Sequence, residues 1–281
     1  MNILSIQSHV AYGHVGNASS VFALQRLGHE VWPVHTVQFS NHPGHGGYRG
    51  MVLPPAHIAD VITGLGERGM LGRCDAVLSG YLGTAETGAA ALAAVAWAMR
   101  ENPDAVYACD PVIGDHGRIY VAADLAGFFR ERAVPAATVM TPNAFELSLL
   151  TGIEPVSLAE ARRAIAALRA RGPAVVLLTS LTASETPVDS IDVLAGDASG
   201  LWLLRAPRLD RLPNGAGDLI AALFTAHWHA TRSAALALSR AASSVHGILA
   251  RTVKAGEREM LLIAAQDEIL KPSRVLEAVK L

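Results

Sequence analysis

Lysine and cysteine are scarce in this sequence, and each scarcity excludes a class of site. Of the 23 basic residues only Lys254, Lys271 and Lys280 are lysines, and none of the three follows a glycine. A Walker A loop needs a glycine directly before its lysine, so the chain carries no P-loop. The two cysteines, Cys74 and Cys109, are too few and too far apart for a disulfide framework or a zinc knuckle, and we expect both to be buried thiols.

The chain also lacks a long apolar run and an excess of charge of either sign. Its mostly apolar stretches, such as residues 87–99, fall short of the roughly 20 residues that a spanning helix needs. The N-terminus lacks the basic flank and the small-residue cleavage site of a signal peptide. A net charge of -2 gives no electrostatic footprint for a phosphate backbone. We therefore expect a cytoplasmic protein that binds neither a membrane nor nucleic acid.

Short β-branched or apolar runs alternate with longer helical patterns along all 281 residues. Hydrophobic residues make up 51% of the chain and charged residues 17%, which is too apolar for intrinsic disorder. The alternation is typical of an α/β fold with a mainly parallel central sheet flanked by helices. Because no linker, repeat or low-complexity tract divides the chain, we expect one domain over residues 1–281.

Periodicity and turn residues place the expected elements. The predicted strands are residues 3–7, 31–39, 76–79, 106–109, 138–140 and 175–178. The predicted helices are residues 16–27, 55–65, 84–100, 122–132 and 158–171. Ser157 and Glu160 predict a capping box at the start of the last of these. A β-hairpin is expected at 191–204 with its turn at 196–200, followed by two apolar helices at 217–230 and 233–249.

One glycine pattern imitates a dinucleotide-binding motif. Residues 64–69 read G-x-G-x-x-G, but they end a predicted helix and precede a strand. A dinucleotide site requires the reverse order, strand and then helix, so that backbone N–H groups meet the pyrophosphate. We therefore do not expect a dinucleotide site here.

A run of small residues precedes the first of the two apolar helices, in the sequence Asn214-Gly215-Ala216-Gly217-Asp218. Consecutive backbone N–H groups at a helix start can point at one spot, where the helix dipole also favours negative charge, so the turn predicts an anion site. Asp218 in the first helical turn could take a proton from a hydroxyl held beside that anion. Taken alone, the same residues are also typical of a tight turn and a helix cap.

Polar residues follow two neighbouring strands of the predicted sheet. Asp110 comes directly after strand 106–109, and Asn143 and Glu146 follow strand 138–140. Carboxylates and amides at adjacent strand ends can hold a hydrated Mg²⁺ ion, which takes oxygen ligands and keeps several waters. Taken one at a time, each of these residues is also typical of a helix cap or a turn.

Two histidine pairs have loose metal-ligand spacing, but we do not expect zinc. His227 and His229 would lie on different faces of a helix, and no acidic or thiol cluster accompanies His42 and His45. The surrounding Gly44, Gly46, Gly47 and Gly50 instead predict a mobile flap over a substrate, with an ordinary exposed loop as the alternative. Residues 115–117 are a second candidate cover.

Several motifs together resemble the ribokinase-like superfamily, and within it the pyridoxal kinases closely. The resemblance runs from the first strand almost to the C-terminus. Its N-terminal half rests on residues 7–10, 12–17, 36–42 and 78–83, and its C-terminal half on residues 110–115, 141–143, Glu146, 215–218 and 264–267.

The resemblance implies a three-layer α/β/α kinase that transfers phosphate from ATP to the 5'-hydroxymethyl group of pyridoxal, giving pyridoxal 5'-phosphate. Asp218 would be the base that activates the hydroxyl and would also contact the substrate. The turn residues Gly215, Ala216 and Gly217 would offer N–H groups to the transferred phosphoryl group. Ser8 would meet the pyridine ring, with Tyr81 nearby. Such phosphoryl transfer depends chiefly on positioning and charge neutralisation, so the missing P-loop is then expected.

The resemblance also implies a nucleotide and metal site. Asp110 and Glu146 would hold ATP and its Mg²⁺, the metal through water, while Thr141 and Thr179 would line the nucleotide site. Pyridoxal and ATP would be the small-molecule partners, and a homodimer is the expected assembly. A dependence on a monovalent cation stays open.

The chain departs from the family pattern in two places. Thr179 stands where bacterial members often carry a lysine that touches ATP, and Pro43 stands where a threonine often lines the vitamin pocket. As a hypothesis, Arg205, Arg208 or Arg211 replaces the missing positive charge. Two alternative functions remain at this stage: a related small-alcohol kinase, such as one acting on hydroxymethylpyrimidine, and a vitamin B6 binding protein without turnover.

Overall fold

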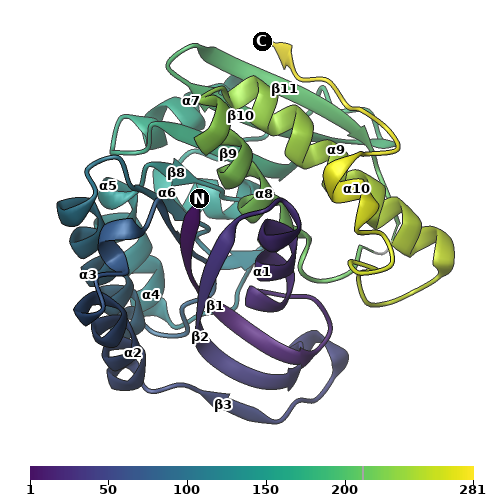
Figure 1. Cartoon of the computed structure of the whole chain (residues 1–281). Coiled ribbons are helices and arrows are strands. Elements are labelled where there is room, and N and C mark those ends of the chain that lie inside the picture. The colour runs from purple at the N-terminus through teal and green to yellow at the C-terminus, as the bar shows by residue number, and fades with distance from the viewer. Residues whose placement is uncertain (211) are drawn as a thin grey trace.

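Ten strands drawn from both ends of the chain form one mixed sheet (Figure 1). The structure, a computed structural model, describes residues 1–210 and 212–281. In chain order the strands of this sheet are β1 (Asn2–Tyr12), β2 (Glu30–Asn41), β3 (Gly50–Val52), β4 (Ala76–Ser79), β5 (Val106–Cys109), β8 (Val139–Met140), β9 (Val175–Leu181), β10 (Ser190–Asp197), β11 (Gly200–Pro207) and β12 (Val279–Lys280). Across the sheet they follow the order β12-β11-β10-β9-β8-β5-β4-β1-β2-β3.

The centre of the sheet is parallel and its two edges are antiparallel. Strands β2, β1, β4, β5, β8 and β9 run in one direction. At one edge β3 pairs antiparallel with β2, and at the other edge β10, β11 and β12 continue antiparallel from β9. The predicted mainly parallel sheet is confirmed, and the hairpin expected at 191–204 is the β10–β11 pair.

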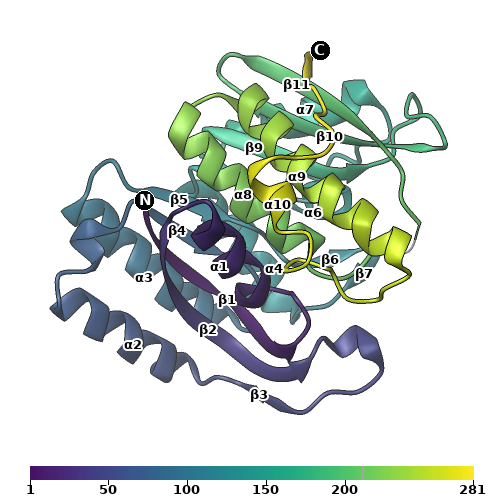
Figure 2. The same cartoon turned by 45° about the vertical axis from the view of Figure 1, so that its right-hand side comes forward.

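Helices cover both faces of the sheet, which makes the three predicted layers (Figure 2). The layer on one face consists of α2 (Pro55–Glu67), α3 (Ala85–Glu101), α4 (Ala123–Phe128), α6 (Ala144–Thr151) and α7 (Leu158–Arg169). The layer on the other face consists of α1 (Asn17–Arg26), α8 (Ala216–Thr231), α9 (Ala234–Ala255) and α10 (Asp267–Leu270).

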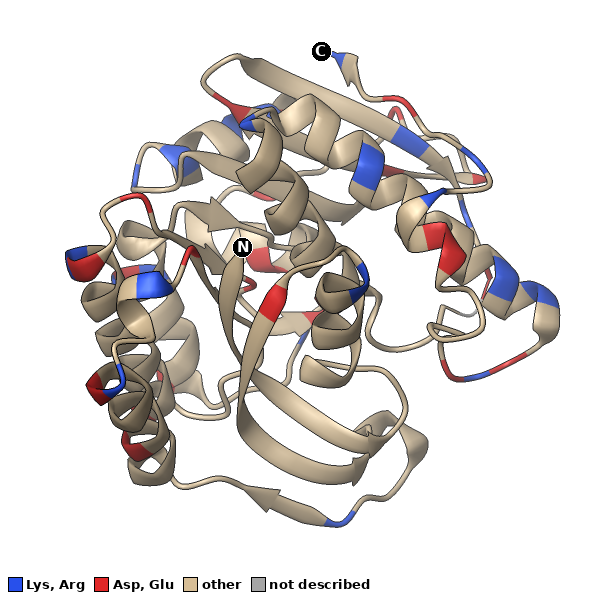
Figure 3. Ribbon diagram, viewed as in Figure 1, with Lys and Arg blue, Asp and Glu red and all other residues tan. Residues whose placement is uncertain are grey.

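Alternation along the strands explains the two hydrophobic cores. On β1, Leu4 and Ile6 belong to the core that faces α2 and α3, while Ile3 belongs to the core that faces α8 and α9. The four residues of β4 and of β5 are all buried, as expected for central parallel strands covered on both faces. In Figure 3 the charged residues lie mostly on the outer helices and connections.

Most predicted elements agree with the structure to within a few residues, but several short ones were missed. The helix predicted at 122–132 is confirmed, but α4 continues through a π-helical turn (Phe129–Ala133) into the short α5 (Val134–Ala136), so the helical segment ends later than expected. Prediction from periodicity also missed α6, the edge strands β3 and β12, and a small hairpin formed by β6 (Gly114–Asp115) and β7 (Arg118–Ile119). These elements are too short for a periodic pattern to show.

The predicted capping box at α7 is half formed. Ser157 Oγ accepts from the backbone N of Glu160 at 3.2 Å, but the Glu160 side chain meets the Ser157 hydroxyl at 3.0 Å rather than the backbone. The complete box lies at α6, where Asn143 and Glu146 satisfy each other's backbone N–H groups. Sequence spacing alone could not show which of these carboxylates turns toward the backbone.

Three further expectations concern single residues. Both cysteines are free and buried, as predicted. The G-x-G-x-x-G run occupies the end of α2, where Gly66 lets the Trp97 ring of α3 approach. Within the described part of the chain, no helix is both long enough and apolar enough to cross a bilayer.

The packing of α2 on α3 predicts that alanine substitution has opposite effects on stability at two glycines half a turn apart in α2. A Cβ at Gly66 would lie 2.2 Å from the Trp97 ring, whereas a Cβ at Gly64 would meet no described atom within 4 Å. We expect Gly66→Ala to destabilise the protein by about 1–3 kcal/mol through overpacking. Gly64→Ala should stabilise it by about 0.5–1 kcal/mol, since alanine is the better helix residue. Urea unfolding of both variants measures the difference, and equal values would contradict this packing.

Candidate active site

The small-residue turn forms the N-terminus of α8, as predicted. Gly215 takes the N-cap position with φ of 90°, and a Cβ there would lie 1.9 Å from the carbonyl oxygen of His14. Only glycine fits that combination of positive φ and close approach. The helix begins at Ala216, so the N–H groups of its first turn lack partners within the helix and attract an anion.

Asp218 is fixed by a turn from the other end of the chain. Its Oδ2 accepts from the backbone N–H of Gly16 at 2.8 Å, and its carbonyl oxygen accepts from the Ser20 hydroxyl at 3.2 Å. Burial in the cleft raises the pKa of Asp218 to about 6, and the bond from Gly16 opposes part of that rise. A carboxylate with this pKa is ionised at neutral pH and basic enough to accept a proton from a bound hydroxyl.

Asp110 follows β5 and lies buried at the carboxyl end of the sheet. The hydroxyl of Thr141, which follows β8, donates to Asp110 Oδ1 at 2.9 Å. Burial, together with the negative charge of Asp218, raises the pKa of Asp110 to about 7, and the hydrogen bond from Thr141 opposes part of that rise. The negative charge of Asp218 thus acts on Asp110, so the ends of β5 and β8 lie near the turn of α8. This is the juxtaposition that the order of motifs predicted.

Glu146 lies beside the same cleft but is held by backbone groups. Its Oε1 accepts from the N–H groups of Ile113 and Gly114 at 3.0 and 3.4 Å, and its Oε2 accepts from that of Asn143 at 3.0 Å. Burial, together with the charge of Asp110, raises the pKa of Glu146 well above its usual value. Glu146 thus joins the loop after β5 to the start of α6. The helix-cap alternative is correct for its geometry.

Of the two residues predicted at the vitamin ring, Ser8 lies within β1 and Tyr81 follows β4. Gly16 packs directly on Ser8, since a Cβ at Gly16 would lie 2.4 Å from Ser8 Oγ. The carbonyl oxygen of Tyr81 accepts from the Thr36 hydroxyl at 2.6 Å, and its ring packs against a small apolar cluster. The buried members of that cluster are Val10, Val15, Val37 and Phe39. Ser8 therefore lies next to the turn that holds Asp218, beside an apolar surface suited to an aromatic ring.

A buried polar network, which the sequence did not predict, supports the apolar surface beside Ser8. Asn17 is 2% exposed, and its Oδ1 accepts from the Ser5 hydroxyl at 2.7 Å. Its Nδ2 lies 3.1 Å from the carbonyl oxygen of Val34 and 3.0 Å from His35 Nδ1. The network ties α1 to β1 and β2 just below Ser8. The available signal was polar residues at alternate positions of β1, Ser5 and Gln7, in an otherwise apolar strand.

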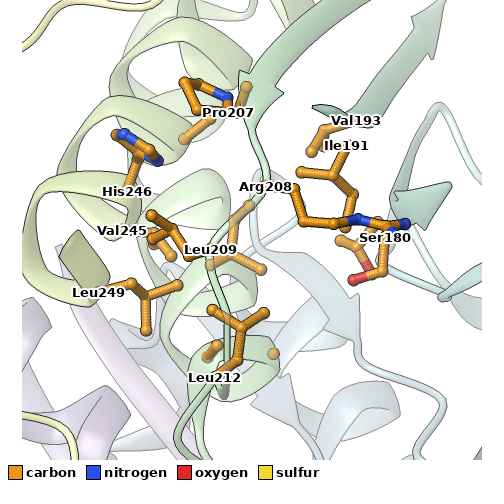
Figure 4. A pocket seen from close by; sticks show the side chains of 16 residues that line it. Ser180, Ile191, Val193, Pro207, Arg208, Leu209, Leu212, Val245, His246 and Leu249 are labelled. Carbon is orange, nitrogen blue, oxygen red and sulfur yellow. The ribbon is translucent and has the colours of Figure 1, made fainter. Parts of the chain in front are cut away.

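Thr179 lines a pocket beside the turn of α8, and Figure 4 shows the side chains around this pocket. Its backbone N donates to the carbonyl oxygen of Pro142 at 3.0 Å. The pocket also contains Ala216 and Gly217, and its other walls are mostly apolar side chains: Ile191, Val193, Leu209, Leu212, Ile220, Val245 and Leu249. A nucleotide base fits such apolar walls, while the helix N-terminus fits its phosphates.

The three arginines of the charge hypothesis have different surroundings. Arg205 forms a bidentate pair with the fully buried Asp192, at 2.7 and 2.8 Å, so its charge is already neutralised. Arg208 lines the pocket, with its side chain extending toward Ser180 in Figure 4 and bonded to Thr182 Oγ1 at 3.0 Å. Arg211 lies outside the described residues. Of Arg205 and Arg208, only Arg208 lines the pocket.

The two predicted covers lie in loops. The flap contains a 3-10 turn (Pro43–His45), in which Gly44 N donates to His42 Nδ1 at 3.1 Å, and it leads into the edge strand β3. Residues 115–117 form the tip of the β6–β7 hairpin, whose Gly114 is held by Glu146. Within the described residues no three His, Cys, Asp or Glu side chains converge as a metal-binding group. A magnesium ion here would therefore take most of its ligands from water and phosphate oxygens.

An anion site at a helix N-terminus, a positioned carboxylate in its first turn and an apolar pocket beside it are typical of a small-alcohol kinase on a ribokinase-like α/β fold. The sequence profile of the phosphomethylpyrimidine kinase family matches residues 54–262. A protein of Granulibacter bethesdensis named pyridoxal kinase PdxY is 54% identical over 278 residues, 97% of each chain. One of Corynebacterium diphtheriae with the same name is 48% identical over 97% of this chain and 96% of its own.

Solved structures agree with these relatives. The pyridoxal kinase from Leishmania donovani in complex with ADP and pyridoxamine matches with a TM-score of 0.92 and 29% identity, covering 100% of this chain and 99% of its own. The chain belongs to the pyridoxal kinase family.

The raised pKa of Asp110 predicts that the stability of the folded protein depends on pH. Because the pKa of Asp110 is raised in the folded chain, the folded state favours the protonated form. That stabilisation is complete below about pH 4 and is lost as the pH rises through about 7. We expect Asp110→Asn, which keeps the shape without the charge, to be more stable than the wild type at pH 8 by on the order of 2 kcal/mol.

Thermal unfolding without nucleotide, at pH 5 and pH 8, measures this difference. The advantage of Asp110→Asn should shrink at pH 5, where the wild-type carboxyl is protonated as well. The exposed Asp104→Asn is the matched control and should follow the wild type at both pH values. If the difference in unfolding temperature between Asp110→Asn and the wild type is the same at pH 5 and pH 8, the raised pKa of Asp110 is contradicted.

Proposed function

We propose that this chain phosphorylates the 5'-hydroxyl of pyridoxal with ATP, giving pyridoxal 5'-phosphate in vitamin B6 salvage. The observation that carries the proposal is the position of Asp218, one helical turn inside an anion-binding helix start and bonded to Gly16, which packs on Ser8. The close relatives named pyridoxal kinase support the choice of substrate. A protein that only stores the vitamin or its phosphate would not need a buried base beside the anion turn.

In the proposed reaction the substrate hydroxyl is held beside Asp218. The hydroxyl oxygen attacks the γ-phosphorus of ATP as its proton passes to Asp218, and the bond between that phosphorus and the bridging oxygen of ADP breaks. Backbone N–H groups of Gly215, Ala216 and Gly217 receive the charge of the transferred phosphoryl group. They are fixed before the reaction begins, so little reorganisation is needed.

A magnesium ion fits the acids of this cleft. Asp110 is buried with a raised pKa beside a second acid, so a bound cation would relieve the repulsion. Asp110 would hold the ion through water. Glu146 would contribute only the lone pairs of its carboxylate that do not already accept from backbone N–H groups. The ion would supply charge neutralisation for the phosphates. Dependence on a monovalent cation stays a prediction of the family resemblance.

The nucleotide is proposed to lie in the pocket beside Thr179, with Thr141 near its phosphates. Thr179 is neutral, so it cannot offset the negative charge of the nucleotide. Arg208 supplies a cation on the facing wall of this pocket. This restricts the earlier charge hypothesis, because Arg205 is occupied by Asp192.

A homodimer is the proposed assembly. Exposed apolar residues gather at the ends of β1 and β3, where the sheet has a free edge: Tyr12 is 64% exposed, Tyr48 51%, Met51 57% and Val52 44%. Burying such a patch against a second copy would remove apolar surface from water. A cytoplasmic location and the absence of nucleic-acid partners likewise stay predictions.

The role of Asp218 predicts a separation of turnover from binding. Asp218→Asn keeps the size of the side chain and an oxygen that can accept from Gly16, but it removes the base. We expect kcat to fall on the order of 10²- to 10⁴-fold while pyridoxal binding changes little. ADP release measures kcat, and calorimetric titration with pyridoxal measures binding.

The same ADP assay separates the alternatives. ADP formation with pyridoxal but not with hydroxymethylpyrimidine supports the proposed substrate. ADP formation only with hydroxymethylpyrimidine would instead favour a pyrimidine kinase, the activity after which the matching family profile is named. Tight pyridoxal binding without ADP would instead indicate a storage protein. An Asp218→Asn variant as active as the wild type would remove Asp218 from the mechanism.

The proposed role of Arg208 predicts a nucleotide-specific defect. Arg208→Ala should raise the KM for ATP on the order of threefold to tenfold, because an Arg–phosphate contact is lost, while the KM for pyridoxal stays as it was. The exposed Arg73→Ala serves as the control. Steady-state kinetics with each substrate varied in turn gives both constants, and an unchanged KM for ATP would exclude Arg208 from the nucleotide site.

A further inference from the structure

Glu259 lies far along the sequence from the flap and from the β1–α1 turn, yet it contacts both. It belongs to the connection between α9 and α10. Its Oε1 lies 2.6 Å from Nε2 of His45 in the flap, and its Oε2 accepts from the backbone N of His14 at 3.3 Å. The side chains of Glu259 and His45 are only 14% and 23% exposed, so water screens their contact little.

The turn is shaped to admit this carboxylate. Gly13 has φ of 100°, and a Cβ at that position would lie 2.2 Å from Glu259 Oε2. A side chain at residue 13 would therefore displace the carboxylate from its place beside His14. The ring of Tyr12 also meets the His45 ring edge-on, with centroids 6.3 Å apart. The flap, the turn and the α9–α10 connection thus come together around one side chain.

Two short paths lead from this junction to the reacting groups. The carbonyl oxygen of His14 packs against Gly215, and two residues later the N–H of Gly16 holds Asp218. On the flap side, Gly44 lies next to His45, and a Cβ at Gly44 would be 3.5 Å from Nδ2 of Asn214. Asn214 directly precedes the anion turn.

An open cavity between the same segments shows why the junction matters. It is lined by residues 44–46 of the flap, by residues 212–214 before the anion turn and by part of the α9–α10 connection. The flap and the chain opposite therefore stand apart over this space. The Glu259–His45 contact joins the flap to the body of the protein at one side of it.

We propose that Glu259 is a positioning residue for the kinase reaction. One carboxylate oxygen holds the flap over the alcohol, and the other holds the turn that presents the Gly16 N–H to Asp218. This inference rests on the proposed function for its kinetic consequences. The contact itself can be tested without any turnover.

The proposal predicts a selective kinetic defect. Glu259→Ala should lower kcat/KM for pyridoxal at least tenfold, with a rise in the KM for pyridoxal, because the flap and the turn lose their common anchor. The KM for ATP should change less than twofold, since the nucleotide pocket lies on the β9–β11 side of α8. Glu259→Gln, whose amide oxygen can still accept one of the two bonds, should recover part of the loss. Glu277→Ala, at an exposed acid near the C-terminus that does not line this cavity, is the control and should behave as the wild type.

A double-mutant cycle tests whether Glu259 acts through His45. His45→Ala alone should reproduce a large part of the defect. The double variant should lose much less kcat/KM for pyridoxal than the product of the two single losses, because either substitution alone already breaks the contact. Fully multiplicative effects would overturn the coupling of flap and acid.

Trypsin cleavage after Arg49 reports the order of the flap independently of catalysis. Arg49 is exposed and lies in the flap just before β3. Glu259→Ala and His45→Ala should each speed cleavage at this bond at least threefold, whereas cleavage after the exposed Arg73, outside the flap, should keep its wild-type rate. Faster cleavage at Arg49 together with the pyridoxal defect supports the proposal.

Unchanged cleavage at Arg49 in both variants would overturn the proposal that Glu259 holds the flap. A fall in kcat with both KM values unchanged would overturn it as well, because a residue with a merely structural role lowers only the amount of active enzyme. If the wild type makes no ADP from pyridoxal, the proposed function fails, but the cleavage rates still decide whether Glu259 holds the flap.

Discussion

The hydrogen bond from the backbone of Gly16 to the carboxylate of Asp218, at 2.8 Å, is the contact on which the cleft depends. It joins a turn near the N-terminus to a helix that begins 200 residues later. Gly16 can make it because its φ is 54° and its backbone lies against Ser8, where a Cβ would be 2.2 Å from the Ser8 carbonyl oxygen. One glycine thus sets the distance between the base and the wall of the vitamin site.

A second constraint is electrostatic. Asp110 and Asp218 are brought near each other by the topology of the sheet, and the charge of Asp218 disfavours ionisation of Asp110. Without a bound cation the folded chain therefore carries an unfavourable interaction at neutral pH. A nucleotide with its metal would relieve that repulsion and so stabilise the protein on binding. The repulsion that destabilises the free protein would then favour binding of the metal cation.

The sequence predicted the layers, the parallel centre of the sheet and the location of the anion turn, because each depends on local pattern. Short apolar runs marked β1, β4 and β5, and small residues before an apolar run marked the start of α8. It could not tell whether Glu146 faces a metal or caps α6, since both uses place a carboxylate three residues after Asn143. It also gave no sign of Glu259, whose partners His14 and His45 lie more than 200 residues away in the chain.

The distribution of the site over the chain has a consequence for folding. The wall for the vitamin comes from β1, β2 and β4, the acids from the ends of β5 and β8, and the anion turn from α8, so the cleft does not exist until distant segments have met. Such long-range contacts form late, because each requires a long loop to close. A chain truncated before α8 would keep Ser8, Tyr81 and Asp110 but lose the base and the anion site together.

This interdependence also supports the proposal that residues 1–281 form one domain. The sheet takes β12 from the last residues of the chain onto the edge opposite β3, and α1 packs on the same face as α8, α9 and α10. A boundary between an N-terminal and a C-terminal half would have to cut the pairing of β8 with β5 and expose both buried cores. The hydrophobic surface released by that cut would disfavour either half alone, so the kinase site and the folded core require the same full length of chain.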